Sequence, residues 1–435
     1  MVMNEPTRFE RLYQQTGWTM RQMAQAVNRL GTECGIPLRY REPSVHQWRG
    51  GALPRDVVRP LVLEVLSRRL DRPVTDLEAG FPVACTQLAS TVEGLLDLGS
   101  CDMDPSRRGV MGAATAFSVA MATPAWADVA GRMEAVQSGR RIGMPDVDMV
   151  TRMTDRLAKL DGEFGGRRVR PMASSFLVNT VVPCLRAEAP SDVRSAMLSA
   201  AAFLSYLTGW MAVDEGAHGL AQRYYTKGLE LAGAAGDHST YCHILRGMSV
   251  QAAGLGHGPS AVRLANAATA SAPITGPRMV AFMAGQQAHA YAVAGDKTAA
   301  FGSLRETEKA LDQASTTTTF GGFSASTLAY LSAQVRYSLG DVPGSIRSLE
   351  EHFRVRDDGD SHRSFLRFSA LLAERRLEVG HLESACATWN AVLDDYPTMQ
   401  SGQVDRHVQQ IAVRLRPYRS NAVARATYER AASAA

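Results

Sequence analysis

Residues 380–393 read GHLESACATWNAVL, and this stretch contains the pattern that decides the fold. A Gly stands first, a small Ala follows five positions later, and a large Trp follows nine positions later. Successive glycines of this pattern are 40, 39, 45 and 40 residues apart. The four earlier copies are Gly216/Ala221/Tyr225, Gly256/Ala261/Ala265, Gly295/Ala300/Leu304 and Gly340/Ser345/Leu349.

The physics of this repeat predicts paired helices. Glycine adopts the positive φ that ends a helix, and the Asp in Gly295-Asp296 and Gly340-Asp341 is suited to open the next one. The small residue lets the two helices approach closely. One hairpin cannot cover its own apolar face, so several must stack to create a core. Since apolar residues recur at helical spacing elsewhere and alternating strands are absent, we expect an all-α fold.

Residues 195–400 resemble tetratricopeptide repeats, and the copy that begins at Gly380 and ends near Pro397 is the clearest. The spacing is looser than the family's period of about 34 residues. Ala265 is small where the family has a large side chain, and Thr307 or His352 stands where another small residue is usual. The resemblance implies an α-solenoid, and we interpret residues 146–190 and 403–432 as degenerate capping units.

In such arrays the first helix of each hairpin lines the concave face, so the resemblance also implies a set of contact residues. Aromatic, amide and Arg groups together suit an extended peptide or a protein segment, and a small-molecule effector is a further option. Ordinary packing or solvation is the alternative explanation for each residue. The candidates are Tyr206, Trp210, His243, Arg246, His289, Tyr330, Gln334, Arg367 and Glu374.

The first 80 residues are organised differently, as short helices separated by Gly and Pro. Thr19 is the expected N-cap of a helix over residues 19–30, whose apolar residues share one face. Residues 43–51 read PSVHQWRGG and predict a short helix that Ser44 caps and the glycines end. Pro54 precedes a longer predicted helix with the apolar face Val58, Leu61, Val62, Val65 and Leu66.

The short helix has the side chains that reading a DNA major groove requires. Arg bonds bidentately to guanine, Gln bonds to adenine, and a small hydroxyl can hold phosphate. The region through Pro54 resembles the phage-repressor-like, XRE-type helix-turn-helix class, in which a similar Ser-Val-x-x-Trp-x-x-Gly run closes the recognition helix. The segment before this helix is longer than the usual tight turn. The candidate contacts to double-stranded DNA are Arg39, Tyr40, Arg41, Ser44, His46, Gln47 and Arg49.

Charge sets a limit on this prediction. The whole chain has a net charge of only +4, and residues 1–80 contain twelve Arg and nine acidic residues. This excess supports a modest number of phosphate contacts, so we expect a homodimer that binds two half-sites. A helical bundle that merely carries Arg on its surface is the alternative.

We divide the chain into a DNA-binding domain (1–80), a helical connector (81–145) and a repeat domain (146–435). In the connector, Arg107-Arg108 and the nearly uncharged stretch that ends at Ala127 imitate a twin-arginine export signal. The stretch is internal and contains Gly112 and Pro124, so we interpret it as a buried helix and expect no membrane association.

The order of these parts resembles a broad actinobacterial group of repeat-containing regulators, with GWMAVD at 209–214 and AAGD at 234–237 among the shared features. Some members influence antibiotic production and sporulation. The resemblance implies a transcriptional regulator of secondary metabolism or development whose array senses an effector. The alternative is a protein-interaction scaffold whose N-terminal bundle does not bind DNA.

Other function classes lack their signatures. The sequence contains no H-E-x-x-H, no G-x-S-x-G and no phosphate loop that ends in Gly-Lys-Ser/Thr, so we expect neither an enzyme nor a cofactor. The six Cys residues form no C-x-x-C pair and lie near no His cluster. We therefore expect no metal site, no disulfide framework and a cytoplasmic protein.

Overall fold

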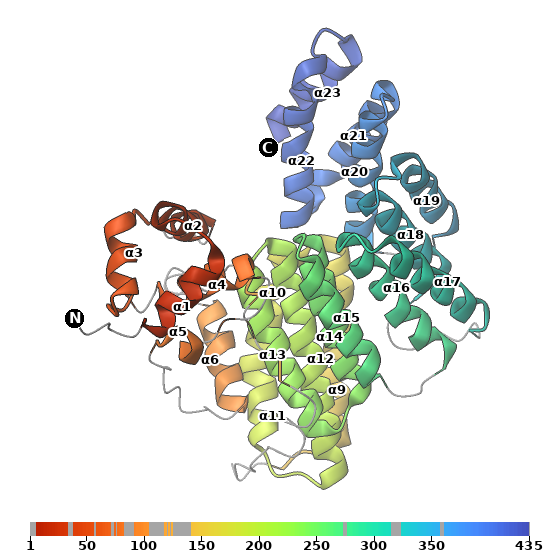
Figure 1. Cartoon of the computed structure of the whole chain (residues 1–435). Coiled ribbons are helices and arrows are strands. Elements are labelled where there is room, and N and C mark those ends of the chain that lie inside the picture. The colour runs from red at the N-terminus through yellow and green to blue at the C-terminus, as the bar shows by residue number, and fades with distance from the viewer. Residues whose placement is uncertain are drawn as a thin grey trace.

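The structure is a computed structural model in which residues 6–33, 38–55, 58–70, 74, 76–81, 91–103, 117–119, 121, 123–124, 141–272, 276–314, 323–356 and 361–434 are described. Within these residues every regular element is a helix, and the single isolated bridge joins Arg141 to Glu188. The predicted all-α class is confirmed. An N-terminal helical bundle is followed by a solenoid-like array of helices (Figure 1).

The N-terminal bundle has its own core. Phe9, Val27 and Trp48 are buried in it, and so is the predicted apolar face of residues 58–66. Thr19 caps the second helix as predicted, because its Oγ1 accepts a hydrogen bond from the Gln22 N–H at 3.3 Å. The helices of the bundle are α1 (Arg8–Thr16), α2 (Met20–Glu33), α3 (Glu42–Arg49), α4 (Arg59–Leu70) and α5 (Asp76–Ala79).

Ser44 does not cap α3, contrary to the prediction. The helix begins at Glu42, Arg41 occupies the N-cap position, and no side chain bonds to this helix end. Pro43 explains the earlier start, because its fixed φ suits the first helical turn and its missing N–H needs no partner there. Ser44 therefore lies inside the first turn and is half-buried.

The described residues of the connector include the helix α6 (Thr91–Met103), which packs against the array. Asp102 of α6 forms a buried ion pair with Arg170, which also bonds Glu215. The helix predicted between residues 109 and 127 is absent at residues 117–119, 121 and 123–124. The remainder of that prediction, including the twin arginines, lies outside the described residues.

The array consists of helices joined in antiparallel pairs. It begins with α9 (Met144–Phe164) and α10 (Gly166–Phe176), which continues through the π-turn η2 (Leu177–Val181) into α11 (Val182–Arg186). The pairs that follow are α12 (Ser191–Glu215) with α13 (His218–Ala235), α14 (His238–Gly254) with α15 (Gly258–Ser271), α16 (Pro277–Val293) with α17 (Lys297–Asp312), α18 (Ala325–Ser338) with α19 (Val342–Val355), α20 (His362–Glu378) with α21 (Leu382–Asp395), and α22 (Gly402–Leu415) with α23 (Ala422–Ala434).

The repeat read from the sequence is confirmed in these pairs. Each anchoring glycine follows the first helix of its pair and has a φ between 78° and 86°. The small residue five positions later is fully buried in every copy, and the residue nine positions later is at most 5% exposed. Asp296 and Asp341 cap the second helices by accepting backbone N–H groups at 2.9 Å.

Helix α12 is long and apolar enough to cross a membrane by length and composition alone. However, 72% of its most apolar window is buried inside the protein, where it packs mainly against α13, α10 and α9. Burial on this scale is typical of the core helix of a folded domain.

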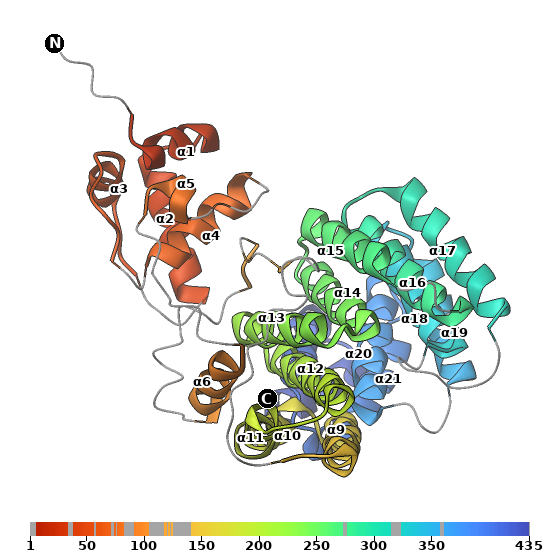
Figure 2. The same cartoon turned by 90° about the horizontal axis from the view of Figure 1, so that it is seen from below.

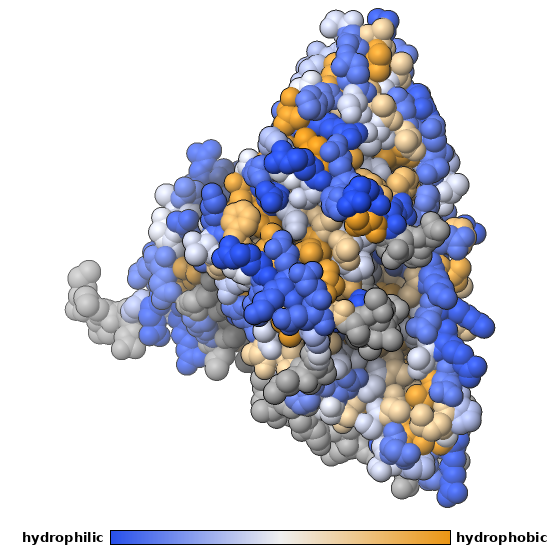
Figure 3. All heavy atoms as spheres, turned by 90° about the vertical axis from the view of Figure 1, so that its right-hand side faces the viewer, coloured by the Kyte–Doolittle hydropathy of each residue, from blue (hydrophilic) through white to orange (hydrophobic). Residues whose placement is uncertain are grey.

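The surface on the side of α16, α17 and α19 carries many hydrophilic side chains, with hydrophobic ones gathered in bands between them (Figure 3).

The two ends of the array contact each other. The Gln400 N–H donates to the Phe164 carbonyl at 2.7 Å, and the Arg167 N–H donates to the Gln400 carbonyl at 3.2 Å. Beside this pairing, Arg363 of α20 donates to Asp161 of α9 at 2.8 Å. Figure 2 shows the C-terminal helices beside α9 and α12, and the array therefore closes on itself instead of remaining an open superhelix.

Gly165 is required at this closure, which gives a first prediction. It has a φ of +92°, and a Cβ here would collide with the Gln400 carbonyl oxygen. We expect Gly165→Ala to lower the free energy of unfolding by about 2 kcal/mol or more, as the strained backbone conformation alone costs about 1–3 kcal/mol. The control is Gly302→Ala in α17, where a Cβ meets open space.

Thermal and urea unfolding measure both variants. We expect Gly302→Ala to be neutral or to stabilise the protein by up to about 1 kcal/mol, because Ala is the better helix former. Equal stability of the two variants would contradict the role assigned to the closure.

Candidate functional site

The predicted DNA-reading residues fall into two groups. His46 and Gln47 are exposed on the outer face of α3, and Arg39 and Arg41 are exposed just before it. Tyr40 is half-buried instead, because its ring packs edge-on against Trp48 with ring centres 5.1 Å apart. The four residues His46, Gln47, Arg39 and Arg41 are thus accessible in and just before α3, as groove reading requires.

The backbone of Tyr40, just before α3, is held in place by one side chain of α2. Asn28 donates its Nδ2 hydrogen to the Tyr40 carbonyl at 2.8 Å and accepts the Tyr40 N–H at 2.7 Å. This pair of bonds fixes where α3 begins relative to α2, although the two helices are not joined by a tight turn.

Arg49 has an internal partner, Glu10. Its guanidinium forms a bidentate ion pair with Glu10 of α1 and lies 4.9 Å from the ring centre of Tyr13. The hydrogen bond from Arg49 lowers the pKa of the Glu10 carboxyl below its usual value. The structure therefore gives Arg49 a role in joining α3 to α1, and this contact would have to break before Arg49 could reach a base.

A cavity of about 810 Å³ lies inside the closed array. Its walls come almost entirely from the first helices of the pairs: α12, α14, α16, α18, α20 and α22. Its size falls within the range of small-molecule sites in proteins. The predicted residues that line it are Tyr206, Trp210, His243, Arg246, His289, Tyr330, Gln334 and Arg367.

Glu374 is the one predicted contact residue that does not line the cavity. It lies on α20 two turns beyond Arg367, but α22 covers it there. Its carboxylate bonds His407 at 2.7 Å and Arg414 at 3.3 Å, both on α22. Glu374 thus links two helices of the closure.

Sequence reasoning missed the contribution of α22. Gln403, Arg406 and His407 line the cavity, although residues 403–432 were interpreted as a capping unit. The only signal for them is the closure of the array, which brings α22 next to α12. A local repeat pattern does not contain that information. Phe282, Gln286 and Phe368 were also missed, and they lie on inner helix faces next to predicted residues.

Arg246 is a half-buried cation in the wall of the cavity. Its Nε donates to the Phe282 carbonyl at 3.2 Å, and its guanidinium carbon lies 3.8 Å from the centre of the Phe282 ring. Burial lowers the pKa of Arg246 to about 10. It stays protonated at neutral pH, but its charge is held where water solvates it poorly.

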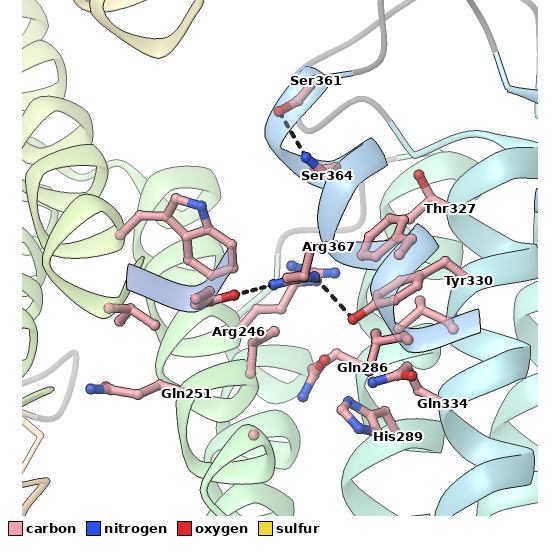
Figure 4. Close-up of a pocket in the computed structure, with 18 of the residues that line it drawn as sticks. Arg246, Gln251, Gln286, His289, Thr327, Tyr330, Gln334, Ser361, Ser364 and Arg367 are labelled. Carbon is pink, nitrogen blue, oxygen red and sulfur yellow. Dashed lines mark hydrogen bonds between the residues drawn. The ribbon is translucent and has the colours of Figure 1, made fainter. Parts of the chain in front are cut away.

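Arg367 and Arg375 are held by neutral groups. Arg367 donates to Gln403 at 2.6 Å and to the Tyr330 hydroxyl at 3.0 Å (Figure 4). Arg375 bonds Ser345 at 2.6 Å and also Gln334. Within the described residues, both guanidinium groups bond only neutral partners, and each has a buried Nε with no partner.

Two histidines of the cavity, His243 and His289, are neutral at physiological pH. Burial lowers the pKa of His243 to about 3 and that of His289 to about 4. The positive charges of Arg246, Arg367 and Arg375 contribute further to the low pKa of His289. These three guanidinium groups therefore act on one region of the cavity, which Figure 4 shows with Arg246 and Arg367 drawn near its centre. No metal-binding cluster of His, Cys, Asp or Glu exists among the described residues.

The neutrality of His289 gives a second prediction. Below pH 6.5 the unfolded chain protonates this His, whereas the folded protein does not until about pH 4. Its contribution to stability is therefore complete above pH 6.5 and is lost as the pH falls toward 4. Between pH 7 and 5 the loss is on the order of 1–2 kcal/mol.

We expect His289→Gln to lose less stability than the wild type between pH 7 and 5 in urea unfolding. The exposed His46→Gln variant serves as control and should follow the wild type. Burial raises the pKa of Asp161 to about 6, which makes the folded protein more stable as the pH falls. This effect is the same in wild type and His289→Gln, so it cancels when the two pH profiles are compared. Parallel pH profiles of wild type and His289→Gln would show that His289 is protonated in the folded state.

Comparison with known proteins bears on the N-terminal bundle. Residues 9–82 match the family model described as the SP15 N-terminal domain, a match that extends from α1 through α5. A comparison with curated proteins found no match for this chain. Over its bundle, the chain is similar to the SP15 N-terminal domain.

Proposed function

We propose that this protein is a sequence-specific DNA-binding transcriptional regulator of secondary metabolism or development. In this proposal the bundle is a helix-turn-helix domain of the phage-repressor-like class, and the array is a tetratricopeptide-type effector domain. The protein acts in the cytoplasm as a homodimer and is not an enzyme. The observation that carries the proposal is the exposed face of α3, with His46 and Gln47 on a bundle connected to a closed array that contains a cavity.

The geometry of α3 supports the DNA-binding part. Val45 and Trp48 anchor one face in the core, which leaves His46 and Gln47 exposed on the other. A helix held in this way can enter the major groove without unfolding, and Gln bonds the adenine edge there. Arg39 and Arg41 are exposed beside it and suit phosphate contacts.

A short segment between the two parts supports regulation of the bundle by the array. Glu64 of α4 accepts hydrogen bonds from the Ser118 hydroxyl and the Val119 N–H, both at 2.9 Å. Gln222 of α13 bonds both backbone groups of Ser118, at 2.7 and 2.8 Å. An effector that favours one arrangement of the array can therefore act on the bundle through residues 117–119.

The scaffold alternative draws on the internal ion pair of Arg49, which leaves fewer exposed cations for phosphate. Salt distinguishes the two functions. DNA affinity that rests on phosphate contacts falls steeply with ionic strength, whereas a scaffold has little DNA affinity at any salt concentration.

A third prediction concerns DNA selection by the full chain. We expect discrete genomic sites at near-physiological salt, and a loss of these sites in the His46→Ala/Gln47→Ala variant. Loss of the base contacts should weaken specific binding by roughly 10-fold or more. Neither residue packs in the core, so the helical content and melting temperature should stay unchanged.

Two control variants sharpen this experiment. Arg11→Ala removes an exposed charge of α1 and should leave the selected sites unchanged. Arg49→Ala removes the partner of Glu10 and should lower the stability of the bundle, so it does not test base reading. Recovery of random DNA by both wild type and the double variant, with or without cell extract as a source of effector, would favour the scaffold.

A further inference from the structure

We propose that the cavity inside the array binds a small amphipathic carboxylate, whose anionic group is held by Arg246 and Arg367 and whose apolar body lies against the aromatic walls. This inference deepens the proposed function and rests on it for the role of the ligand as an effector. Binding itself depends only on the cavity.

The charge of the lining is the first argument. Arg246, Arg356, Arg367 and Arg406 line the cavity, and none of the described lining residues is Asp or Glu. The whole chain, by contrast, has nearly balanced charges, with 47 Lys and Arg and 43 Asp and Glu. Among the described lining residues, cationic side chains thus outnumber anionic ones.

The desolvation of Arg246 is the second argument. A buried charge is costly unless it is paired, and Arg363 shows the ordinary solution in this array, with Asp161 and Asp214 as its partners. The terminal nitrogens of Arg246 have no hydrogen-bond partner among the described residues. An incoming anion would supply the missing counter-charge in a region of low dielectric, where ion pairs are strong.

An unsatisfied donor in the same region forms the third argument. The Nε of Arg367 is buried without a partner. Buried polar groups are normally hydrogen-bonded, and an exception needs an explanation such as a ligand. A carboxylate can accept from two donors at once, which suits a pair of guanidinium groups.

The aromatic residues of the cavity walls determine the chemistry of the part of the ligand beyond its carboxylate. Tyr206, Trp210, Phe282, Tyr330 and Phe368 surround the charged centre, and Tyr206 is stacked on Trp210 with ring centres 6.4 Å apart. Aromatic faces favour an apolar or aromatic body over a strongly hydrated one. A volume of about 810 Å³ accommodates such a molecule, whereas inorganic phosphate would leave most of the apolar surface uncovered.

The test measures binding of phenylbutanoate and octanoate to the full chain by calorimetry, beside their neutral amides and inorganic phosphate. We expect each carboxylate to bind at least 10-fold more tightly than its amide, because the amide cannot satisfy the two charged groups. A seven-residue apolar peptide with a free or an amidated C-terminus tests whether a peptide carboxylate is the natural source.

Variants locate the site. Arg246→Gln and Arg367→Gln should each reduce carboxylate affinity by roughly 10-fold or more. The matched control Arg354→Gln changes an exposed Arg that pairs with Glu351 outside the cavity, and it should bind as the wild type does. Circular dichroism checks folding. If a variant does not fold, the comparison of carboxylate with amide on the wild type still decides the proposal.

The outcomes separate clearly. Equal binding of acid and amide would show an apolar cavity without anion selectivity, and phosphate binding alone would show an anion site without an apolar body; either result overturns the proposal. Preference for the amide, or no binding of any organic acid or free-terminus peptide, also overturns it. Carboxylate binding in a protein that selects no DNA would uphold this inference and refute the proposed function.

Discussion

The closure of the array is the constraint on which the rest of the structure depends. Two backbone hydrogen bonds at Gln400 join the end of the array to the turn after α9, and Arg363 adds a buried charge contact to Asp161. Helical hairpins alone stack into an open superhelix, because each pair contacts only its neighbours. Closure turns the shared concave face into the wall of a cavity, and it restricts access of water to the side chains within.

This restriction explains the electrostatics of the cavity. On an open concave face, Arg246 and Arg367 would be solvated, and His289 would titrate near its ordinary pKa. Inside the closed array, burial lowers the pKa values of both Arg246 and His289. The same low dielectric that makes an unpaired guanidinium costly also strengthens its interaction with an anion, so the site is poised to gain from a ligand.

The parts of the structure that sequence reasoning anticipated are those encoded locally. The glycine, the small residue and the packing residue of each hairpin act within about ten positions, so the repeat and the inner helix faces could be predicted. Pairings between distant residues left no such pattern. Arg49 bonds Glu10 across 39 positions, and Gln403 meets Arg367 across 36, so the internal role of the first and the lining role of the second were missed. The prediction that Glu374 is a contact residue was wrong for the same reason, since only the closure places α22 over it.

A connection between cavity and bundle follows from the same architecture. Gln251 and Leu255 line the cavity at the end of α14, and His257, two residues after Leu255, is the N-cap residue of α15. The ring of His257 stacks on Phe117 with ring centres 4.9 Å apart, and the adjoining Ser118 bonds Glu64 of the bundle. A ligand that shifts the end of α14 would move a residue in direct contact with the segment that holds the bundle. Because α14 packs against α13, α15 and α16, a small displacement at the cavity is more readily passed along the helix than absorbed within it.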